Sequence, residues 1–200
     1  MADSRTDPRV FLLDPDERGV LPLDAFHVPR RLRRTVRRDP YEIRIDTAFA
    51  DVLAGCAAAA PGREETWINE RIVSLYCELH TQGDAHCVEA WRDGELVGGL
   101  YGVRLGAAFF GESMFSRADD ASKITLVHLA ARLAAGGFRL LDTQFITEHL
   151  RQFGAVEIDR AHYHARLRAA IEADGDFFAI PDPMVGTDAL AILDAAADTR

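Results

Sequence analysis

The pattern of apolar and polar residues predicts alternating strands and helices through most of the chain. Two strand-like runs, residues 85–92 and 95–105, are separated by Asp93-Gly94, a strong signal for a tight β-hairpin. A third run covers residues 107–115. These three segments predict an antiparallel meander.

Helical spacing of apolar residues is clearest at residues 70–82 and 120–135, and Gly136-Gly137 marks the end of the second helix. Weaker patterns add a strand at 41–46, a helix at 47–60, a strand at 138–144, a helix at 147–153, a strand at 154–158 and a helix at 160–173. The pattern does not define the placement of the Ala-rich residues 188–198.

This order of elements is that of the acyltransferase fold often called GNAT. The sequence therefore predicts an α+β protein with a GNAT-like fold, whose mixed sheet contains an antiparallel meander flanked by helices. An acetyl-CoA enzyme of this fold needs a glycine-rich turn before its central helix, where backbone N–H groups bind the pyrophosphate. Here the turn reads S-R-A-D-D-A-S-K, with Asp119 and Asp120 at that place. Acetyl-CoA is therefore disfavoured, and we expect no cofactor.

The composition of the 200 residues, 48% hydrophobic and 28% charged, is that of an ordinary globular protein with a sizeable core. No apolar run approaches the ~20 residues of a membrane helix, and no signal-peptide core precedes residue 10. We expect a cytoplasmic protein with no membrane partner. The spacing of the cysteines and histidines predicts free thiols and no metal site, for Cys56, Cys77, Cys87, His80 and His86.

The net charge of −9 argues against simple nonspecific nucleic-acid binding, and we expect no DNA partner. One basic segment departs from this acidic balance. Leu32 and Val36 have the i, i+4 spacing of one helical face, and six arginines surround them: Arg30, Arg31, Arg33, Arg34, Arg37 and Arg38. This stripe is either a solvated helix face or a ridge that contacts RNA phosphates with a strong dependence on salt.

The densest polar detail lies around Glu112, Asp142 and Gln144. Asp142 and Gln144 are two apart on a predicted strand, so both side chains should point to one face, beside the meander strand that carries Glu112. Such a group suits a catalytic site. The alternative is a buried Asp and Gln that satisfy each other at the end of a sheet.

Several longer strings carry a resemblance to a known family: Y-x-x-L-H-x-x-G-x-A-H-C-V-E-A-W, G-G-L-Y-G, G-E-S-M-F-S-R, A-S-K, L-D-T-Q and G-A-V-E-I. By these strings, between about Asp14 and His162, the chain resembles the bacterial leucyl/phenylalanyl-tRNA-protein transferases. That family carries leucine or phenylalanine from aminoacyl-tRNA onto proteins that begin with Arg or Lys, which marks them for degradation under the N-end rule. The resemblance implies these two kinds of partner.

The resemblance also implies the roles of individual residues. Gln144 and Asp142 are expected at the reacting amine and ester, with the carboxylate orienting the amide or receiving the proton, and Glu112 is expected to hold the positively charged acceptor. Aminolysis needs a neutral amine, a fixed carbonyl and a route for a proton. Since the aminoacyl ester is already activated, positioning supplies much of the rate.

The family's pocket for the aminoacyl side chain matches Leu100, Phe109, Leu129 and Leu141, although core packing explains each of them equally well. Strand alternation also puts Leu141 opposite Asp142 unless the strand is bulged. Discrimination among apolar side chains rests on about 1–3 kcal/mol per methylene, so methionine is expected as a third substrate.

Two further residues are expected to contact tRNA. Trp67 matches the family's T-W-I string and is expected to stack on the terminal adenine. Lys123, at the start of the central helix, is expected to meet a phosphate. A structural tryptophan and a merely exposed lysine are the simpler alternatives.

Family members usually carry an N-terminal segment that ends in a G-I-F-P-like motif, and this sequence starts just after it, through a late start or a genuine shortening. We therefore expect residues 1–40 to be the remnant of that segment with its basic helix, 41–173 the transferase domain and 174–200 a C-terminal tail. Two other functions stay open. One is a truncated, non-catalytic relative that binds tRNA or basic protein N-termini; the other is a GNAT-like aminoacyl-tRNA-dependent transferase with a different amine acceptor.

Overall fold

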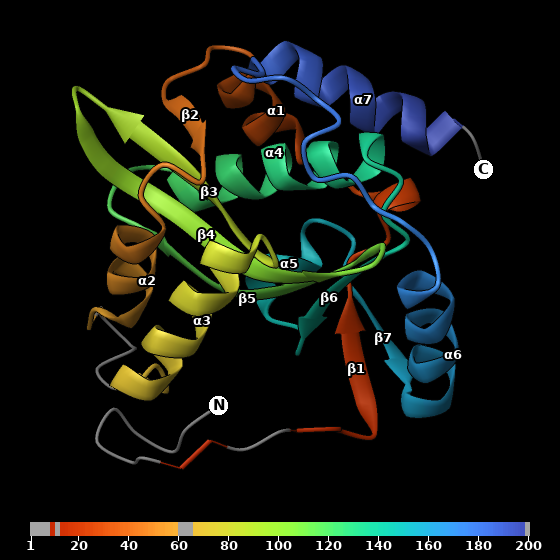
Figure 1. Ribbon diagram of the computed structural model, residues 1–200. Helices are drawn as coiled ribbons and strands as arrows, with labels where there is room; N and C mark the ends of the chain where they lie inside the picture. Colours follow the sequence, from red (N-terminus) through yellow and green to blue (C-terminus); the bar gives the residue numbers. More distant parts are fainter. Residues whose placement is uncertain (1–8, 11–12, 60–65, 199–200) are drawn as a thin grey trace.

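The computed structural model describes residues 9–10, 13–59 and 66–198, and its centre is a seven-stranded sheet in the order β2-β3-β4-β5-β6-β1-β7 (Figure 1). Neighbouring strands are antiparallel except for β5 and β6, which are parallel. The predicted α+β class and the mixed sheet with its meander are confirmed. The strands are β1 (Glu17–Val20), β2 (Glu42–Ile45), β3 (Ala85–Arg92), β4 (Glu95–Leu105), β5 (Ala108–Ser116), β6 (Leu140–Gln144) and β7 (Val156–Asp159).

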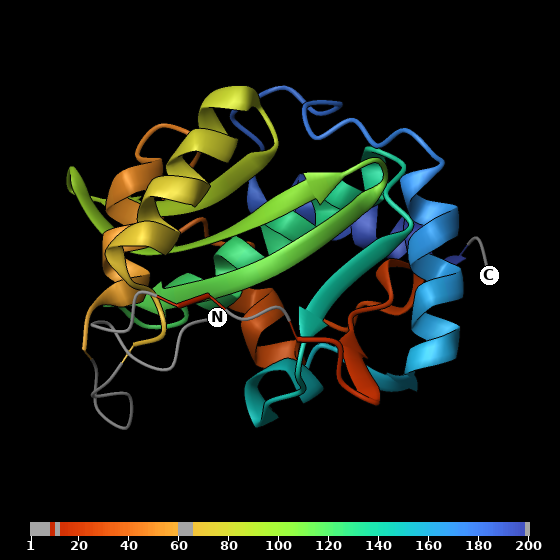
Figure 2. The same cartoon turned by 60° about the horizontal axis from the view of Figure 1, so that its bottom comes forward.

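Helices cover both faces of the sheet (Figures 1 and 2). The central helix α4 packs on one face with α1 and α7 beside it, while α2 and α3 cover β3 to β5 on the other face and α6 lies against β1, β6 and β7. None of the helices in the described part of the chain is long and apolar enough to cross a bilayer. Their bounds are α1 (Arg30–Val36), α2 (Phe49–Ala57), α3 (Glu70–Gln82), α4 (Ala121–Ala135), α5 (Glu148–Arg151), α6 (Arg160–Ile171) and α7 (Gly186–Asp198), with a 3-10 turn η1 (Leu23–Ala25).

Local sequence explains the best-defined boundaries. Asp93 and Gly94 have φ values of 54° and 80°, the left-handed pair that a two-residue hairpin of this kind requires. Helix α3 begins after Asn69, whose side chain accepts a hydrogen bond from the Ile72 N–H, and ends at Gly83 with φ of 83°. The other predicted elements are present, with ends that differ from prediction by at most three residues.

A glycine brings the central helix close to the sheet. A Cβ atom built on Gly98 of β4 would lie 2.6 Å from the Cβ of Ala121, closer than side-chain carbons approach. Any larger residue at position 98 would therefore push the start of α4 away from β4. The contact matters because the same helix carries residues of the site described below.

Segments from both ends of the chain complete this structure. Strand β1 lies between β6 and β7, and α7 packs against α4. The fully buried Arg132 donates hydrogen bonds of 3.0 Å to the carbonyl oxygens of Phe177 and Ile180 and pairs with Asp182, which ties the segment before α7 to α4. The sequence pattern did not predict β1 and left α7 unplaced. The division of the chain at residues 40 and 173 stays a prediction.

Candidate active site

A cavity opens where the parallel strands part. β5 and β6 pair only over Ala108 to Phe110 and Leu140 to Asp142, and beyond this point the two strands diverge (Figure 2). The space between them is a cavity of about 590 Å³, within the usual range for small-ligand sites. Because it reaches through the sheet, it is lined from α4 on one side and from α3 on the other.

The α4 side of this cavity is mainly apolar, although Ser122 of α4 also lines it. Leu129 and Leu141, each 1% exposed, are among its lining residues, and the others of this kind are Leu100, Met114, Leu126 and Leu150. Leu141 does face away from Asp142, as strand alternation requires. It still lines the cavity because the cavity passes between the strands to the α4 face.

Phe109 does not line this cavity, contrary to its expected place in the aminoacyl pocket. Its partner across the strands, Leu141, does line the cavity, so pairing in the sheet does not explain the difference. The Phe109 side chain instead packs among core aromatic rings. Its ring is fully buried, 5.7 Å from the ring of Phe177 and 6.4 Å from that of Phe138. Phe109 is a core residue behind the cavity.

Glu112 reaches the opposite, polar side of the cavity from an irregular point in β5. Tyr101 pairs with Ser113 and Gly102 with Gly111, so the register skips Glu112, as it does at a β-bulge. Burial raises the pKa of the Glu112 carboxyl, while a hydrogen bond with Tyr76 acts in the opposite direction. Tyr76 and Tyr101 also line the cavity, with their rings 5.1 Å apart.

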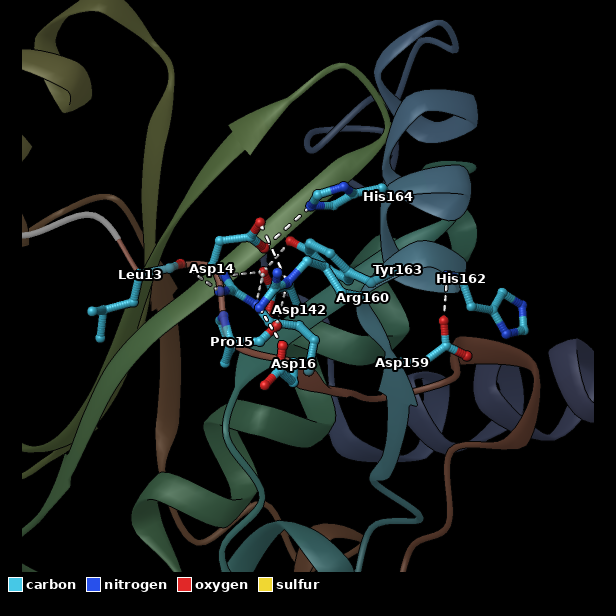
Figure 3. Close-up of polar contacts among 11 residues, drawn as sticks. Leu13, Asp14, Pro15, Asp16, Asp142, Asp159, Arg160, His162, Tyr163 and His164 are labelled. Carbon is cyan, nitrogen blue, oxygen red and sulfur yellow. Dashed lines mark hydrogen bonds and ion pairs between the residues drawn. The ribbon is translucent and has the colours of Figure 1, made fainter.

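Asp142 is fully buried and does not line the cavity. Its carboxylate accepts hydrogen bonds from the Arg18 Nε at 3.0 Å, the Arg18 Nη2 at 2.7 Å and the Gln144 backbone N–H at 2.7 Å. It also accepts a hydrogen bond from the Tyr163 hydroxyl at 2.6 Å (Figure 3). Burial, followed by the hydrogen bond with Asp142, raises the pKa of Tyr163, so its hydroxyl remains a donor. These contacts join β6 to β1 and α6.

Gln144 lines the cavity from the end of β6, on a distorted backbone. Gly19 pairs with Gln144 and Val20 with Asp142, so the register skips Thr143, and Gln144 has φ of 58°. The prediction that Asp142 and Gln144 point to one face by simple alternation is therefore wrong. The alternative of an Asp and a Gln side chain that satisfy each other is also incomplete, because the carboxylate bonds the backbone N–H of Gln144.

The residues expected to contact tRNA are spread over the molecule. Trp67 lines the cavity, whereas Lys123 is not among its lining residues and its Nζ lies 2.6 Å from the Asp120 carboxylate. Helix α1 packs on α4 and α7, on the face of the sheet opposite α3. On this helix Arg33 pairs with Asp194 at 2.6 Å. The exposed arginines on the helix and just after its end are Arg30, Arg31, Arg34, Arg37 and Arg38.

The histidines and cysteines have structural surroundings. The His86 Nδ1 lies 2.7 Å from an Asp46 carboxylate oxygen, and the His80 Nδ1 lies 2.9 Å from the carbonyl oxygen of Ala85. In the part of the chain that the structure describes, no three His, Cys, Asp or Glu residues are grouped as a metal site. The three cysteines are free thiols.

Sequence reasoning missed Arg18 and Tyr163, which no local motif marks. Both residues are separated from Asp142 along the chain, by 124 and 21 residues. Only the insertion of β1 beside β6, together with the packing of α6, brings them to the carboxylate.

The fold and cavity together define an α+β protein with a site for an apolar group beside an acidic one. The family model described as leucyl/phenylalanyl-tRNA protein transferase matches residues 20–168. The chain belongs to this family of aminoacyltransferases.

Curated relatives with this name align with nearly the whole chain. The leucyl/phenylalanyl-tRNA–protein transferase of Phenylobacterium zucineum is 67% identical over 90% of this chain and 81% of its own length. The relative from Maricaulis maris is 62% identical over 95% and 88%, and that from Caulobacter vibrioides is 59% identical over 98% and 90%. A solved structure, the C-terminal domain of a putative lysylphosphatidylglycerol synthetase from Agrobacterium fabrum, aligns with 92% of this chain and 64% of its own, with a TM-score of 0.44 and 13% identity, too distant a likeness to support any inference.

Proposed function

We propose that this chain transfers leucine or phenylalanine, and also methionine, from aminoacyl-tRNA to the N-terminal Arg or Lys of proteins, in the cavity between β5 and β6. The observation that carries the proposal is the contrast between the two sides of that cavity. The apolar side, with Leu129 and Leu141, suits the side chain esterified to tRNA, and Glu112 on the polar side suits a cationic acceptor. The use of aminoacyl-tRNA supports a cytoplasmic location.

In this reaction the amine nitrogen attacks the ester carbonyl carbon, a C–N bond forms, and the C–O bond to the terminal ribose breaks. The ammonium group of the acceptor loses two protons, of which one ends on the ribose oxygen and the other in solvent. The Gln144 side chain has a carbonyl that can accept an N–H bond from the amine and an NH₂ that can donate to the developing oxyanion. Asp142 acts through Gln144, because its carboxylate accepts a hydrogen bond from the Gln144 backbone N–H.

We propose a GNAT-like fold for the domain that holds this cavity. The order of elements from β3 to β7 supports it, with three antiparallel strands followed by helix, strand, helix and strand. The only parallel pair among the described strands, β5 and β6, lies beside the central helix α4. Without a glycine-rich turn before α4, the chain is proposed to use the aminoacyl ester as its acyl donor.

For the tRNA, we propose that Trp67 stacks on the terminal adenine and that the exposed arginines on and just after α1, together with Lys123, contact phosphates. The position of Trp67 at the cavity supports the first contact, since stacking is worth about 1–3 kcal/mol per base. Replacing Arg34 and Arg37 by Gln should reduce both the affinity for tRNA and its dependence on salt, by about one phosphate contact for each arginine. An unchanged salt dependence would mean that the stripe is a solvated helix face.

Transfer of labelled leucine from Leu-tRNA to a peptide that begins with Arg tests the main proposal. We expect transfer that requires a free basic N-terminus and that falls in the Gln144→Ala variant. A folded protein that binds tRNA without transfer would instead be the non-catalytic relative, and a preference for neutral amines would indicate a different acceptor.

A pair of leucine variants tests the apolar side of the cavity. Leu129→Ala enlarges the space for the aminoacyl side chain and should raise the use of Phe-tRNA relative to Leu-tRNA by about tenfold. Leu133→Ala is the matched control, because Leu133 is also fully buried on α4 but does not line the cavity. The control should lose stability without a change in preference.

A further inference from the structure

We propose that Arg18 and Tyr163 are positioning residues for the transfer reaction. They fix the Asp142 carboxylate, and Asp142 in turn fixes Gln144 at the cavity. This inference rests on the proposed function, because it requires that Gln144 acts on the reacting groups.

The side chains of Arg18, Asp142 and Tyr163 form one hydrogen-bonded unit that joins β1, β6 and α6. Arg18 donates to both carboxylate oxygens, with Nε at 3.0 and 3.1 Å and Nη2 at 2.7 Å, and its guanidinium lies 5.0 Å from the centre of the Tyr163 ring. The Tyr163 hydroxyl donates to Oδ2 of Asp142 at 2.6 Å. Such charge-assisted bonds in a buried place fix the carboxylate in one orientation.

The unit holds an unusual backbone conformation at the reacting end of β6. Gln144 has φ of 58°, which is uncommon for a residue with a side chain and costs free energy. The Arg18 Nε orients the Asp142 Oδ1 atom. This oxygen accepts a hydrogen bond of 2.7 Å from the Gln144 backbone N–H. This bond compensates the backbone cost and sets the direction in which the Gln144 side chain leaves the strand.

The same contacts indicate that Asp142 does not receive a proton during the reaction. A proton on this carboxyl would displace a donor from Arg18, Tyr163 or Gln144, and would leave a buried group without its partner. The carboxylate therefore keeps its charge, and the protons released by the acceptor pass to the ribose oxygen and to solvent. Asp142 is a positioning residue like its two partners.

Arg18 also connects this unit to a second part of the cavity lining. Its Nη1 donates to the carbonyl oxygen of Leu13 at 3.2 Å, and Leu13 and Arg18 both line the cavity. The residues that follow Leu13 are tied to α6, because Arg160 lies 2.5 Å from Asp16 and His164 lies 3.1 Å from Asp14 (Figure 3). Arg18 thus positions Gln144 through the Asp142 carboxylate and Leu13 through a direct hydrogen bond.

Removal of one hydroxyl group tests the role of Tyr163. In Tyr163→Phe we expect kcat for leucine transfer to fall by about tenfold, since a hydrogen bond to a charged group is lost, with KM for tRNA and peptide within about twofold. Tyr41→Phe is the matched control, because the Tyr41 hydroxyl is also buried, bonds the carbonyl oxygen of Asp119 at 2.7 Å, and does not line the cavity. It should leave kcat unchanged.

A double-mutant cycle separates positioning from general stability. If Tyr163 acts through Gln144, Tyr163→Phe should cause almost no further loss of kcat in the Gln144→Ala background. An equal loss in both backgrounds would overturn the inference.

Arg18→Lys should show the same coupling with a larger loss, because lysine keeps the charge but not the two-point contact. A fully active Gln144→Ala variant would also overturn the inference, because Gln144 would then not act on the reacting groups. If the unaltered chain transfers no leucine, the proposed function fails instead.

Discussion

Two carboxylates lie close to the same cavity, and their surroundings are opposite. Asp142 is turned away from the cavity and is held by Arg18, Tyr163 and the Gln144 N–H, whereas Glu112 faces the cavity beside the Tyr76 hydroxyl. A buried charge with full hydrogen bonding is part of the architecture of the site. A carboxylate whose burial raises its pKa, and which faces open space, is ready to gain a cationic partner.

The comparison separates stability from binding. Loss of Asp142 removes a partner from groups that are already buried, so the folded chain itself should suffer. Loss of Glu112 removes a group whose ionised form is poorly solvated, so the folded chain should not suffer and the acceptor should bind less well. Four variants or conditions test this difference.

The largest effect is expected from Asp142→Ala. The variant leaves Arg18, whose side chain is 12% exposed, without its carboxylate partner, which typically costs about 3–5 kcal/mol of unfolding free energy. Urea unfolding of the purified chain measures the loss. Asp142→Asn keeps the volume and one acceptor oxygen and should lose less, and equal losses in the two variants would mean that the charge is unimportant.

A smaller effect, confined to the acceptor, is expected from Glu112→Gln. KM for a peptide that begins with Arg should rise by about 10- to 100-fold, the cost of losing a buried charge pair, while KM for Leu-tRNA stays the same. Steady-state transfer with each substrate varied in turn gives both constants. A rise in KM for Leu-tRNA alone would place Glu112 on the donor side of the cavity.

The pH dependence of the melting temperature should show a smaller effect of Glu112. Burial raises the pKa of Glu112 in the folded chain above its value in the unfolded chain. The contribution of Glu112 to stability is therefore fully present at a pH below its unfolded-state pKa, and it is lost as the pH rises through its folded-state pKa. Glu112→Gln should therefore melt at a higher temperature than the unaltered chain at pH 8, and the difference should shrink toward pH 4. Thermal melts across this range provide the measurement.

The smallest effect is expected from Tyr76→Phe. The hydrogen bond with Tyr76 lowers the pKa of Glu112, so its loss should raise that pKa further. The fall in affinity for the Arg peptide at low pH should then begin at a higher pH than in the unaltered chain. An unshifted profile of KM against pH would show that this hydroxyl does not act on Glu112.

Sequence alone predicts the elements that have local signals. The hairpin at Asp93-Gly94 and the helix between Asn69 and Gly83 follow from turn and cap chemistry within a few residues, and the structure has both with the predicted bounds. Strand β1 has no comparable signal. It is four residues long, and its pairing depends on β6 and β7, far along the chain.

Sequence reasoning named several residues that line the cavity, Glu112 and Gln144 among them, but it did not predict the geometry that brings them there. Glu112 and Gln144 reach the cavity from points where the strand register shifts, and a shift depends on the partner strand as much as on the residue itself. The alternation of side chains along a strand therefore gave a wrong prediction for the direction of Gln144. It also could not tell Phe109 from Leu141, which pair with each other across β5 and β6 although only Leu141 lines the cavity. The roles of these residues in transfer stay predictions.

The pairing of β1 with β6 has a consequence for how the chain is made. Arg18 and Asp142 are 124 residues apart, so a ribosome that adds about 5–20 residues per second needs roughly 6–25 s to make the second after the first. Throughout that interval the nascent strand has no edge to join. The candidate site is therefore assembled late in synthesis, and a chain interrupted before residue 142 has the residues of five of the seven strands but none of the contacts that hold Gln144.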